Sequence, residues 1–152
     1  RALGARSLLA DPRRADIKEK INRIVKKREP FRPFAPSVLE ERAAEFFEHY
    51  EPSPFMLFTF PVRSSQRPTI PAVTHTDGTA RPQGVTAEAI PRYHRLIRRF
   101  GELTGVPVLL NTSFNVQEPI VCSPEDAVAT FQGCDMNYLA LDDFLVTKSA
   151  SS

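Results

Sequence analysis

A cluster of short hydrogen-bonding side chains follows an apolar run near position 110. Residues 106–110 are apolar and rich in Val and Leu, which predicts a buried strand. Ligands of open α/β sheets bind beyond the carboxyl ends of strands, so polar residues at this point indicate a binding site. The competing interpretation is a turn in which Asn and Ser side chains bond to their own backbone. The residues concerned are Asn111, Thr112, Ser113 and Asn115.

The first 32 residues carry a strong positive charge. They hold eleven Lys or Arg against four Asp or Glu, a local +7, whereas the other 120 residues sum to −5. This asymmetry predicts an anionic partner, which could be a nucleic acid, a nucleotide or a phosphorylated small molecule. The alternative is a basic helix whose charges only face solvent.

Two further segments place cations in defined positions. Residues 28–36 alternate Arg28 and Arg32 with prolines and phenylalanines, which predicts a stiff segment whose guanidinium groups suit phosphate or carboxylate. Around a predicted Asp77-Gly78 turn, His75 and Arg81 lie close together. His75 beside Asp77 fits either a structural hydrogen-bonded pair or a catalytic one.

Several common kinds of site are excluded. No glycine-rich phosphate loop and no nucleophile elbow is present, so side chains would have to hold a nucleotide's phosphates. Three or four charge-assisted hydrogen bonds, at roughly 1.5–3 kcal/mol each, suffice for micromolar binding. Cys122 and Cys134 lie twelve residues apart without a histidine at ligand spacing, which predicts buried thiols and neither a zinc site nor a disulfide framework.

The elements that must position these residues alternate between helices and strands, which predicts an α/β fold in one domain of 152 residues. The predicted helices cover residues 12–27, 40–50, 91–105 and 123–133, and the predicted strands cover 37–39, 55–60, 106–110 and 120–122, with hairpins at 72–81 and 138–146. In the helix at 40–50, Ala43, Ala44, Phe46 and Phe47 are the predicted buried residues.

The chain is expected to be soluble and cytoplasmic. No apolar run approaches the roughly 20 residues of a membrane span, and the first residues lack the apolar core of a signal peptide. Residues 149–152 are expected to be a disordered tail or an addition foreign to the domain.

Four separated blocks resemble the C-terminal domain of NodU/CmcH-type O-carbamoyltransferases, and the match spans nearly all of the chain. They are Arg1-Ala2-Leu3-Gly4 with Arg6-Ser7, residues 27–36, residues 74–81, and residues 110–115 continuing through Glu118-Pro119-Ile120-Val121. The resemblance implies that residues 1–148 form a YrdC-like domain, a twisted mixed β-sheet with flanking helices. It also implies a partner, an N-terminal domain of the same polypeptide with an actin-like nucleotide fold.

The family's reaction follows from the same resemblance. ATP, bringing its own Mg²⁺, and carbamoyl phosphate would form a carbamoyl-adenylate here, and the other domain would pass the carbamoyl group to an acceptor hydroxyl. The resemblance implies catalytic roles for Lys27, Arg28 and Arg81 and no metal held by this domain. It implies nucleotide or carbamoyl phosphate binding by Arg1, Arg6, Arg32, His75, Asn111, Thr112, Ser113 and Asn115.

The chain also departs from the family's pattern. It begins inside the first block, and no glycine stands between Asn115 and Glu118. Because the acceptor-binding domain is missing, only the adenylating half-reaction is expected. Two other hypotheses remain open: a non-catalytic nucleotide- or RNA-binding module, and a scaffold whose exposed apolar patch marks a lost interface. The enzymatic hypothesis requires the cations near the start of the chain to fold over the polar segment after Leu110.

Overall fold

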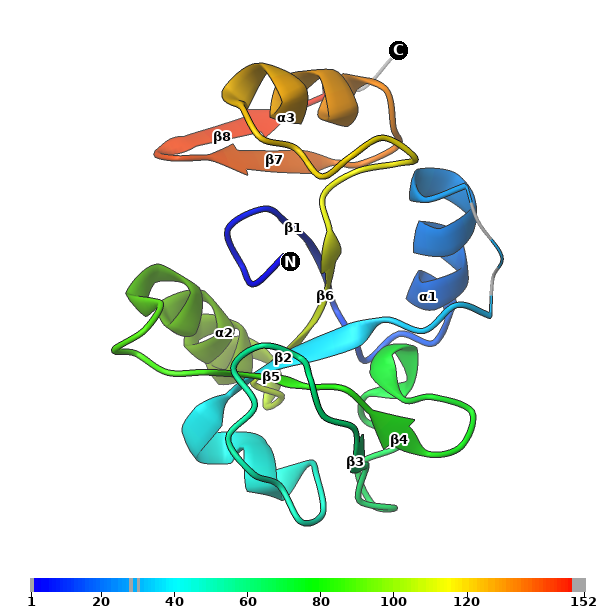
Figure 1. Cartoon of the computed structure of the whole chain (residues 1–152), viewed down its shortest axis with the longest axis vertical. Helices are drawn as coiled ribbons and strands as arrows, with labels where there is room; N and C mark the ends of the chain where they lie inside the picture. The colour runs from blue at the N-terminus through cyan, green and yellow to red at the C-terminus, as the bar shows by residue number, and fades with distance from the viewer. Residues whose placement is uncertain (1, 28, 30, 149–152) are drawn as a thin grey trace.

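Four strands form one mixed sheet, in the order β1-β6-β2-β5 (Figure 1). The computed structural model describes residues 2–27, 29 and 31–148. The long strand β6 runs antiparallel to both β1 and β2, and β2 runs parallel to β5. The strands are β1 (Ser7–Ala10), β2 (Ala35–Leu39), β5 (Gln83–Val85) and β6 (Val108–Ser113).

Strand β6 alternates between two apolar clusters because successive side chains of a strand point to opposite faces. Leu109 packs on one face against Tyr93 and Ile97 of helix α2 (Pro91–Thr104). Proline opens this helix and Gly105 ends it in the left-handed conformation, with φ of 78°.

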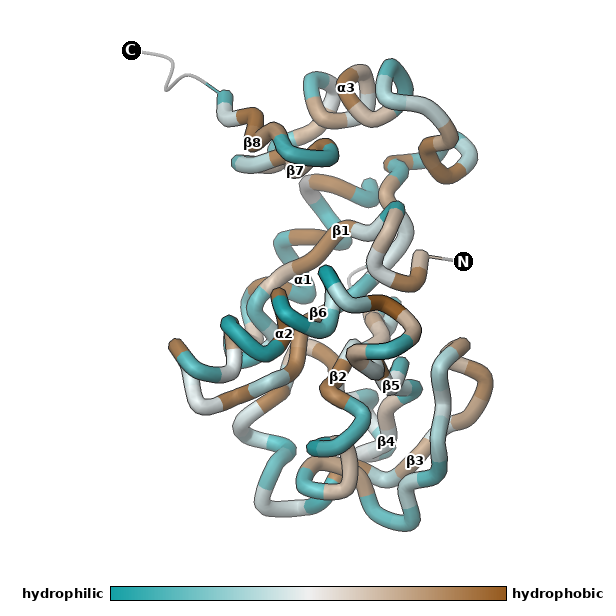
Figure 2. The backbone as a smooth tube through the Cα atoms, turned by 90° about the vertical axis from the view of Figure 1, so that its left-hand side faces the viewer, coloured by the Kyte–Doolittle hydropathy of each residue, from teal (hydrophilic) through white to brown (hydrophobic). Residues whose placement is uncertain are grey.

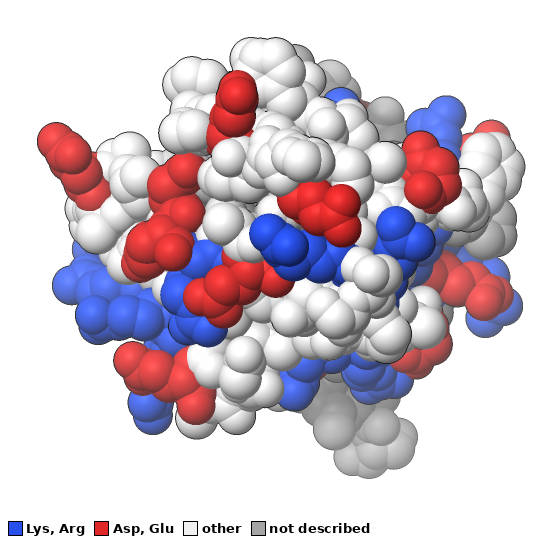
Figure 3. Space-filling model, turned by 90° about the horizontal axis from the view of Figure 1, so that it is seen from below, with Lys and Arg blue, Asp and Glu red and all other residues white. Residues whose placement is uncertain are grey.

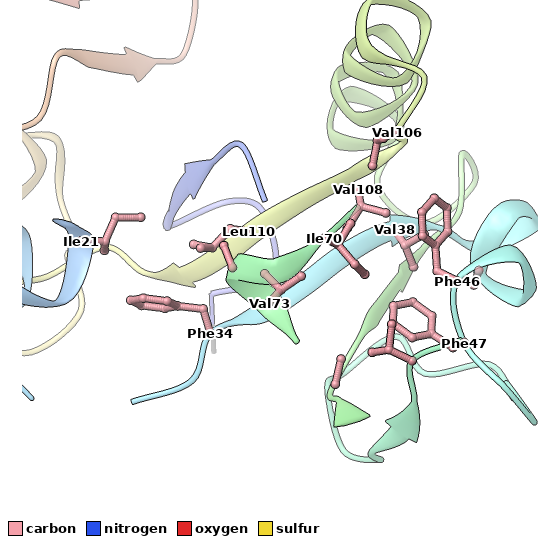
Figure 4. Close-up of a cluster of buried hydrophobic side chains, with 14 of the residues drawn as sticks. Ile21, Phe34, Val38, Phe46, Phe47, Ile70, Val73, Val106, Val108 and Leu110 are labelled. Carbon is pink, nitrogen blue, oxygen red and sulfur yellow. The ribbon is translucent and has the colours of Figure 1, made fainter. Parts of the chain in front are cut away.

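The opposite face of the sheet carries the main core, which includes Val108 and Leu110 (Figure 4). Helix α1 (Asp16–Lys20) and the π-helix η1 (Ile21–Val25) cover one end of it. Short elements cover the rest: the 3-10 helices η2 (Glu40–Glu45) and η3 (Pro71–Val73), and the paired strands β3 (Phe60–Pro61) and β4 (Thr79–Ala80).

The last part of the chain forms a separate layer with its own core. Helix α3 (Pro124–Gln132) packs on the antiparallel hairpin of β7 (Tyr138–Leu141) and β8 (Phe144–Thr147) (Figures 1 and 2). Ser123 and Asp126 form a capping box at the start of α3. Phe114, Val121, Phe131 and Leu139 belong to the apolar cluster of this layer.

The prediction of an α/β fold with a mixed sheet and flanking helices is confirmed. The helix after Pro91, the helix after Ser123 and the closing hairpin lie where they were predicted. The strand predicted at 106–110 exists, but it begins at Val108 and continues to Ser113, so Asn111 and Thr112 lie within the sheet. None of the helices in the described part of the chain is long and apolar enough to cross a membrane.

The first helix was predicted to begin at Pro12, but it begins at Asp16. The carboxylate of Asp11 accepts a hydrogen bond from the Arg13 backbone N–H (3.0 Å), which favours a turn there. The carbonyl of Pro12 accepts a bond from the Ala72 N–H (3.1 Å), so this turn is also tied to a distant segment.

The strand predicted at 55–60 is wrong. Only Phe60 and Pro61 pair with another strand, while Phe55, Leu57 and Phe58 are exposed. The φ of Met56 is 53°, a left-handed conformation that interrupts an extended strand.

Four smaller predictions are also corrected. The Asp77-Gly78 turn forms, with the His75 N–H bonded to the Thr79 carbonyl (2.7 Å), but residues 79–80 pair as a strand with β3, and residues 71–73 form η3. Residues 40–50 hold a short 3-10 helix in which Ala44 is exposed, although Ala43, Phe46 and Phe47 are buried as predicted. Residues 120–122 belong to no strand, and Cys122 is exposed whereas Cys134 is buried.

Candidate functional site

Lys26 brings a cation from the first helical segment to the end of β6. Its ammonium group donates to the carbonyl and hydroxyl oxygens of Ser113 and to the carbonyl and side-chain oxygens of Asn115, the last two at 2.7 Å. The residue is only 4% exposed. All four of these acceptors are uncharged oxygens, and together they fix the position of the ammonium group.

The π-helix explains why Lys26, and not its neighbour, points to β6. The Lys26 N–H bonds to the carbonyl of Ile21 (2.8 Å), five residues back, which widens the turn. Val25 can therefore remain in the core while Lys26 turns toward Ser113. Lys27 follows with φ of 48° and an exposed side chain.

Asn115 is held in one orientation from both ends of its amide. Its oxygen accepts from the Ser113 hydroxyl (2.7 Å) as well as from Lys26, and its nitrogen donates to the Glu118 carbonyl (2.6 Å). This agrees with part of the competing turn interpretation, because Ser113 and Asn115 do bond to each other. The ammonium group of Lys26 also bonds to this turn, and the turn interpretation did not predict that contact.

Glu118 fixes the loop that follows Asn115. Its carboxylate accepts from the backbone N–H groups of Val116 and Gln117 and from the Thr130 hydroxyl, each at 3.0 Å. The backbone N–H groups are the main cause that lowers the pKa of Glu118 to about 2. Beside this loop lies a hollow of about 490 Å³, whose lining includes Val116, Glu118, Pro119, Ile120, Cys122 and Thr130.

Arg6 lies at the same end of the sheet because β1 pairs with β6, with Ser7 opposite Ser113. Its guanidinium donates to the carbonyl of Val121 (3.0 Å) and lies 3.3 Å from the sulfur of Cys122. The Arg6 carbonyl accepts from the Phe114 N–H (3.0 Å). Arg6 and Lys26 therefore approach residues 113–122 from two different elements.

Asn111 is held inside the sheet and not at its tip. Its side chain is 1% exposed and donates to the Ser37 hydroxyl (2.9 Å) and to the side-chain oxygen of Gln83 (3.1 Å). Thr112 of β6 pairs with Leu8 of the neighbouring strand β1 and is half-buried. Both residues support the strand whose end carries Ser113.

Arg32 and His75, two other predicted site residues, have partners other than Ser113 and Asn115. Arg32 pairs with Glu29 at 3.1 Å and accepts a bond from Asn22 on its carbonyl. His75 bonds through Nδ1 to Thr79 (3.1 Å), and the exposed Arg81 lies near enough to act on its pKa. Among the described residues, no hydrogen bond or ion pair connects Lys27, Arg32, His75 or Arg81 to Ser113 or Asn115. Arg1 and Arg28 lie outside the described residues.

The positive charge of the first segment is partly neutralised locally. Arg13 pairs with Asp11 at 2.7 Å, and Arg14 pairs with Asp16 at 2.5 Å. On the face seen in Figure 3, acidic and basic side chains are interspersed. The charge asymmetry of the sequence therefore does not form a single basic surface on that face.

The residues at the end of β6 fit an oxyanion better than a protein-held metal. Lys26 and Arg6 are cationic donors, and the Ser113 hydroxyl adds a neutral one. Within residues 2–27, 29 and 31–148, no group of three or more His, Cys, Asp or Glu is placed to hold a metal ion. Positive charge and a neutral hydroxyl group therefore meet at the end of β6.

Sequence reasoning missed two residues of this site, Lys26 and Glu118. Lys26 was interpreted only as one of the cations in the last turn of the helix, because a regular helix gives no reason to separate it from Lys27. The π-helical turn that separates them is set by packing and has no signal in the local sequence. Glu118 had a signal, since an acidic residue close behind a polar turn is a candidate acceptor for free backbone N–H groups.

Comparisons with known proteins show the family of the chain. The family model described as Carbamoyltransferase C-terminus matches residues 1–148. The chain is 54% identical over its full length to the nodulation protein NolNO of Sinorhizobium fredii, of which it covers 23%. It is 51% identical over its full length to NolO of Bradyrhizobium diazoefficiens, of which it covers 28%.

A third relative is nodulation protein U of Bradyrhizobium diazoefficiens, which is 45% identical over 76% of this chain, a match covering 20% of that protein. The chain spans about a quarter of the length of the first two relatives. Both the family model and these long matches include the segments that carry Arg6, Lys26 and residues 113–118. The chain therefore belongs to the carbamoyltransferase C-terminus family.

Proposed function

We propose that this chain is the adenylating part of an O-carbamoyltransferase. It binds ATP and carbamoyl phosphate and forms a carbamoyl-adenylate, which the rest of a longer polypeptide transfers to an acceptor hydroxyl. The observation that carries the proposal is the meeting of Lys26 with Ser113 and Asn115 at the end of β6, with Arg6 on the adjacent strand. Family membership supports the transferase class.

Each group at this site has a definite task in the proposal. ATP and carbamoyl phosphate are both polyanions, so cations must offset their repulsion before they can react. Lys26 and Arg6 supply that positive charge, and a bound phosphate oxygen would replace some of the hydrogen bonds that Lys26, Ser113 and Asn115 make with one another. The family resemblance assigns further phosphate or carbamoyl contacts to Lys27, Arg28, Arg32 and Arg81, with Arg1 and His75, and those roles stay predictions. Mg²⁺ accompanies the nucleotide.

The hollow beside Glu118 suits the base of the nucleotide. Val116, Pro119 and Ile120 provide apolar surface there, and the hollow of about 490 Å³ exceeds the size of one purine ring. It is lined by the loop that Glu118 fixes, so a base bound there lies next to the proposed phosphate site.

The proposed reaction uses water as a third reactant. Water releases phosphate from carbamoyl phosphate and leaves carbamate, whose oxygen forms a new bond to the α-phosphorus of ATP. The bond from that phosphorus to pyrophosphate breaks, and pyrophosphate leaves with the electron pair. The products are carbamoyl-adenylate, phosphate and pyrophosphate.

Two adjacent lysines allow a matched test of the site. Isothermal titration calorimetry with ATP and Mg²⁺ is expected to show binding by the wild-type chain and at least tenfold weaker binding by Lys26→Ala, because one charge-assisted hydrogen bond contributes roughly 1.5–3 kcal/mol. Ser113→Ala is expected to weaken binding less, because it removes a neutral donor. Lys27→Ala, with its exposed side chain, measures the effect of losing one nearby charge.

Catalysis is tested separately by pyrophosphate release. The wild-type chain is expected to release pyrophosphate from ATP only when carbamoyl phosphate is present, and Lys26→Ala is expected to lose this activity. The proposal fails if the wild-type chain binds no ATP at millimolar concentration, or if folded Lys26→Ala binds it as tightly as Lys27→Ala does.

A further inference from the structure

An apolar groove separates the α3–β7–β8 layer from the rest of the molecule. It encloses about 460 Å³ and lies between β1 and α1 on one side and the β7–β8 hairpin on the other. Its lining is mostly apolar and includes Leu8, Ile17, Ile21, Leu96, Tyr138 and Leu145. Figure 2 shows hydrophobic residues along β7 and β8.

The hairpin presents this apolar surface to solvent. Leu145 pairs with Ala140 across the hairpin, so these two and Tyr138 lie on one face of it, toward the groove. Tyr138 and Leu145 are each 68% exposed, and Leu96 on the facing helix is 49% exposed. Side chains of this size gathered along one groove mark an interaction surface.

Exposed ion pairs connect the hairpin tip to helix α2. Arg92 of α2 pairs with Asp142 at 3.1 Å and with Asp143 at 3.6 Å, which ties the turn of the hairpin to the helix. All four residues of β8 are exposed, and a two-stranded hairpin is marginally stable alone. The groove is therefore present in the chain alone, and covering it would remove exposed apolar side chains from water.

We propose that the groove is the docking site for another part of the same, longer polypeptide. This chain covers 23% and 28% of the length of the two long relatives, so most of each relative lies outside the matched segment. Segments of that remaining chain are tethered to the groove, and tethering favours contact over association with free partners. The occupant is a protruding apolar segment.

A second copy of this chain fits the groove poorly. Away from the hairpin and α2, Phe55, Leu57 and Phe58 form another group of exposed apolar side chains. That segment is tied to β5, since the Gly84 N–H bonds to the Ser53 carbonyl, and β5 is the edge of the sheet opposite β1. Insertion of this segment into a neighbour's groove would be head-to-tail and would not form a closed pair.

Docking at the groove would also place the remaining chain beside the candidate site. Phe114 contributes to the lining of the groove and stands between Ser113 and Asn115. The occupant would thus lie on the other side of the same strand end that holds Lys26. The docking proposal does not depend on nucleotide binding, because its test uses no ligand.

Hydrogen exchange of the β8 amides tests the docking. The experiment compares the 152-residue chain alone with a full-length hybrid in which this chain replaces the matching segment of NolO. In the hybrid, amides of residues 144–147 are expected to exchange at least tenfold more slowly than in the chain alone. Leu145→Asp is expected to abolish this protection, because a carboxylate in the groove would be desolvated.

Leu103→Asp is the matched control, because Leu103 is 70% exposed on α2 and does not line the groove. It is expected to leave the protection unchanged, and Tyr138→Lys serves as a second groove variant if Leu145→Asp does not fold. The proposal is overturned if β8 exchanges equally fast in both proteins. It is also overturned if the chain alone becomes protected as its concentration rises, which would identify a second copy as the occupant.

Discussion

Lys26 and Ser113 lie 87 residues apart in the sequence, yet the ammonium group of Lys26 donates hydrogen bonds to both the carbonyl and the hydroxyl of Ser113. This contact joins the end of the first helical segment to the end of the longest strand of the sheet. The proposed phosphate site therefore exists only when α1 and β6 are packed together.

Replacement of Lys26 is expected to affect stability as well as binding. Lys26→Ala leaves oxygens of Ser113 and Asn115 without their donor, and the expected loss of unfolding free energy is roughly 2–4 kcal/mol. Lys27→Ala is expected to change it by less than about 0.5 kcal/mol, because that side chain is exposed. Urea denaturation of both variants measures the difference. Equal losses would show that the Lys26 contacts contribute little to stability.

Gly4 is expected to tolerate no side chain. Its φ is 102°, and a Cβ there would lie 2.3 Å from the ring of Tyr93, which is buried against the sheet. Gly4→Ala is therefore expected to cost roughly 2–4 kcal/mol through backbone strain and overpacking. It should also displace Arg6 from Val121, since the two residues share one short segment.

Gly133→Ala provides the contrast for Gly4. Gly133 has an ordinary φ of −79° and room for a Cβ, whose nearest neighbour would be 3.4 Å away. This substitution is expected to raise the unfolding free energy by up to about 1 kcal/mol. Thermal unfolding of the two variants should show shifts of opposite sign, and a similar loss for both would refute the steric argument at Gly4.

Glu118 is expected to make part of the unfolding free energy depend on pH in the acidic range. Its pKa is lowered from an ordinary 4.5 to about 2, so the folded state favours the charged form. Its stabilising contribution is therefore complete above pH 4.5 and decreases as the pH falls toward 2. Glu118→Gln should remove this part of the acid dependence, and carbon NMR of the carboxyl group gives the midpoint directly. A midpoint near 4.5 would contradict the assigned hydrogen bonds.

His75 is expected to titrate below its ordinary pKa of 6.5. Burial lowers the pKa most, Asp77 raises it, and Lys18 and Arg81 lower it further. Because the folded state favours the neutral ring, this contribution to stability is complete above pH 6.5 and is lost as the pH falls through the folded pKa. Asp77→Asn should lower the NMR titration midpoint further and Lys18→Met should raise it. Shifts in the reverse directions would exclude this arrangement of charges.

Local sequence signals predicted the elements whose boundaries are set locally. Proline and Gly105 mark the two ends of α2, and Ser123 with Asp126 marks the start of α3. The segment at 55–60 had an equally apolar composition but no local cue for the left-handed Met56, so a strand was predicted where the chain turns. Composition shows that a segment is apolar, but it does not show which partner strand is available.

The residues that bear charge, hydroxyl and amide groups could be read from the sequence, as could the α/β class, the resemblance to carbamoyltransferases and the polar end of the strand at Ser113. Only the tertiary structure decided which cation reaches that end, because a π-helical turn rotates Lys26 toward β6 and leaves Lys27 in solvent. It also placed Asn111 inside the sheet, where neighbouring strands supply Ser37 and Gln83 as partners. Each of these outcomes depends on contacts between residues far apart in the chain, and such contacts leave no pattern in the local sequence.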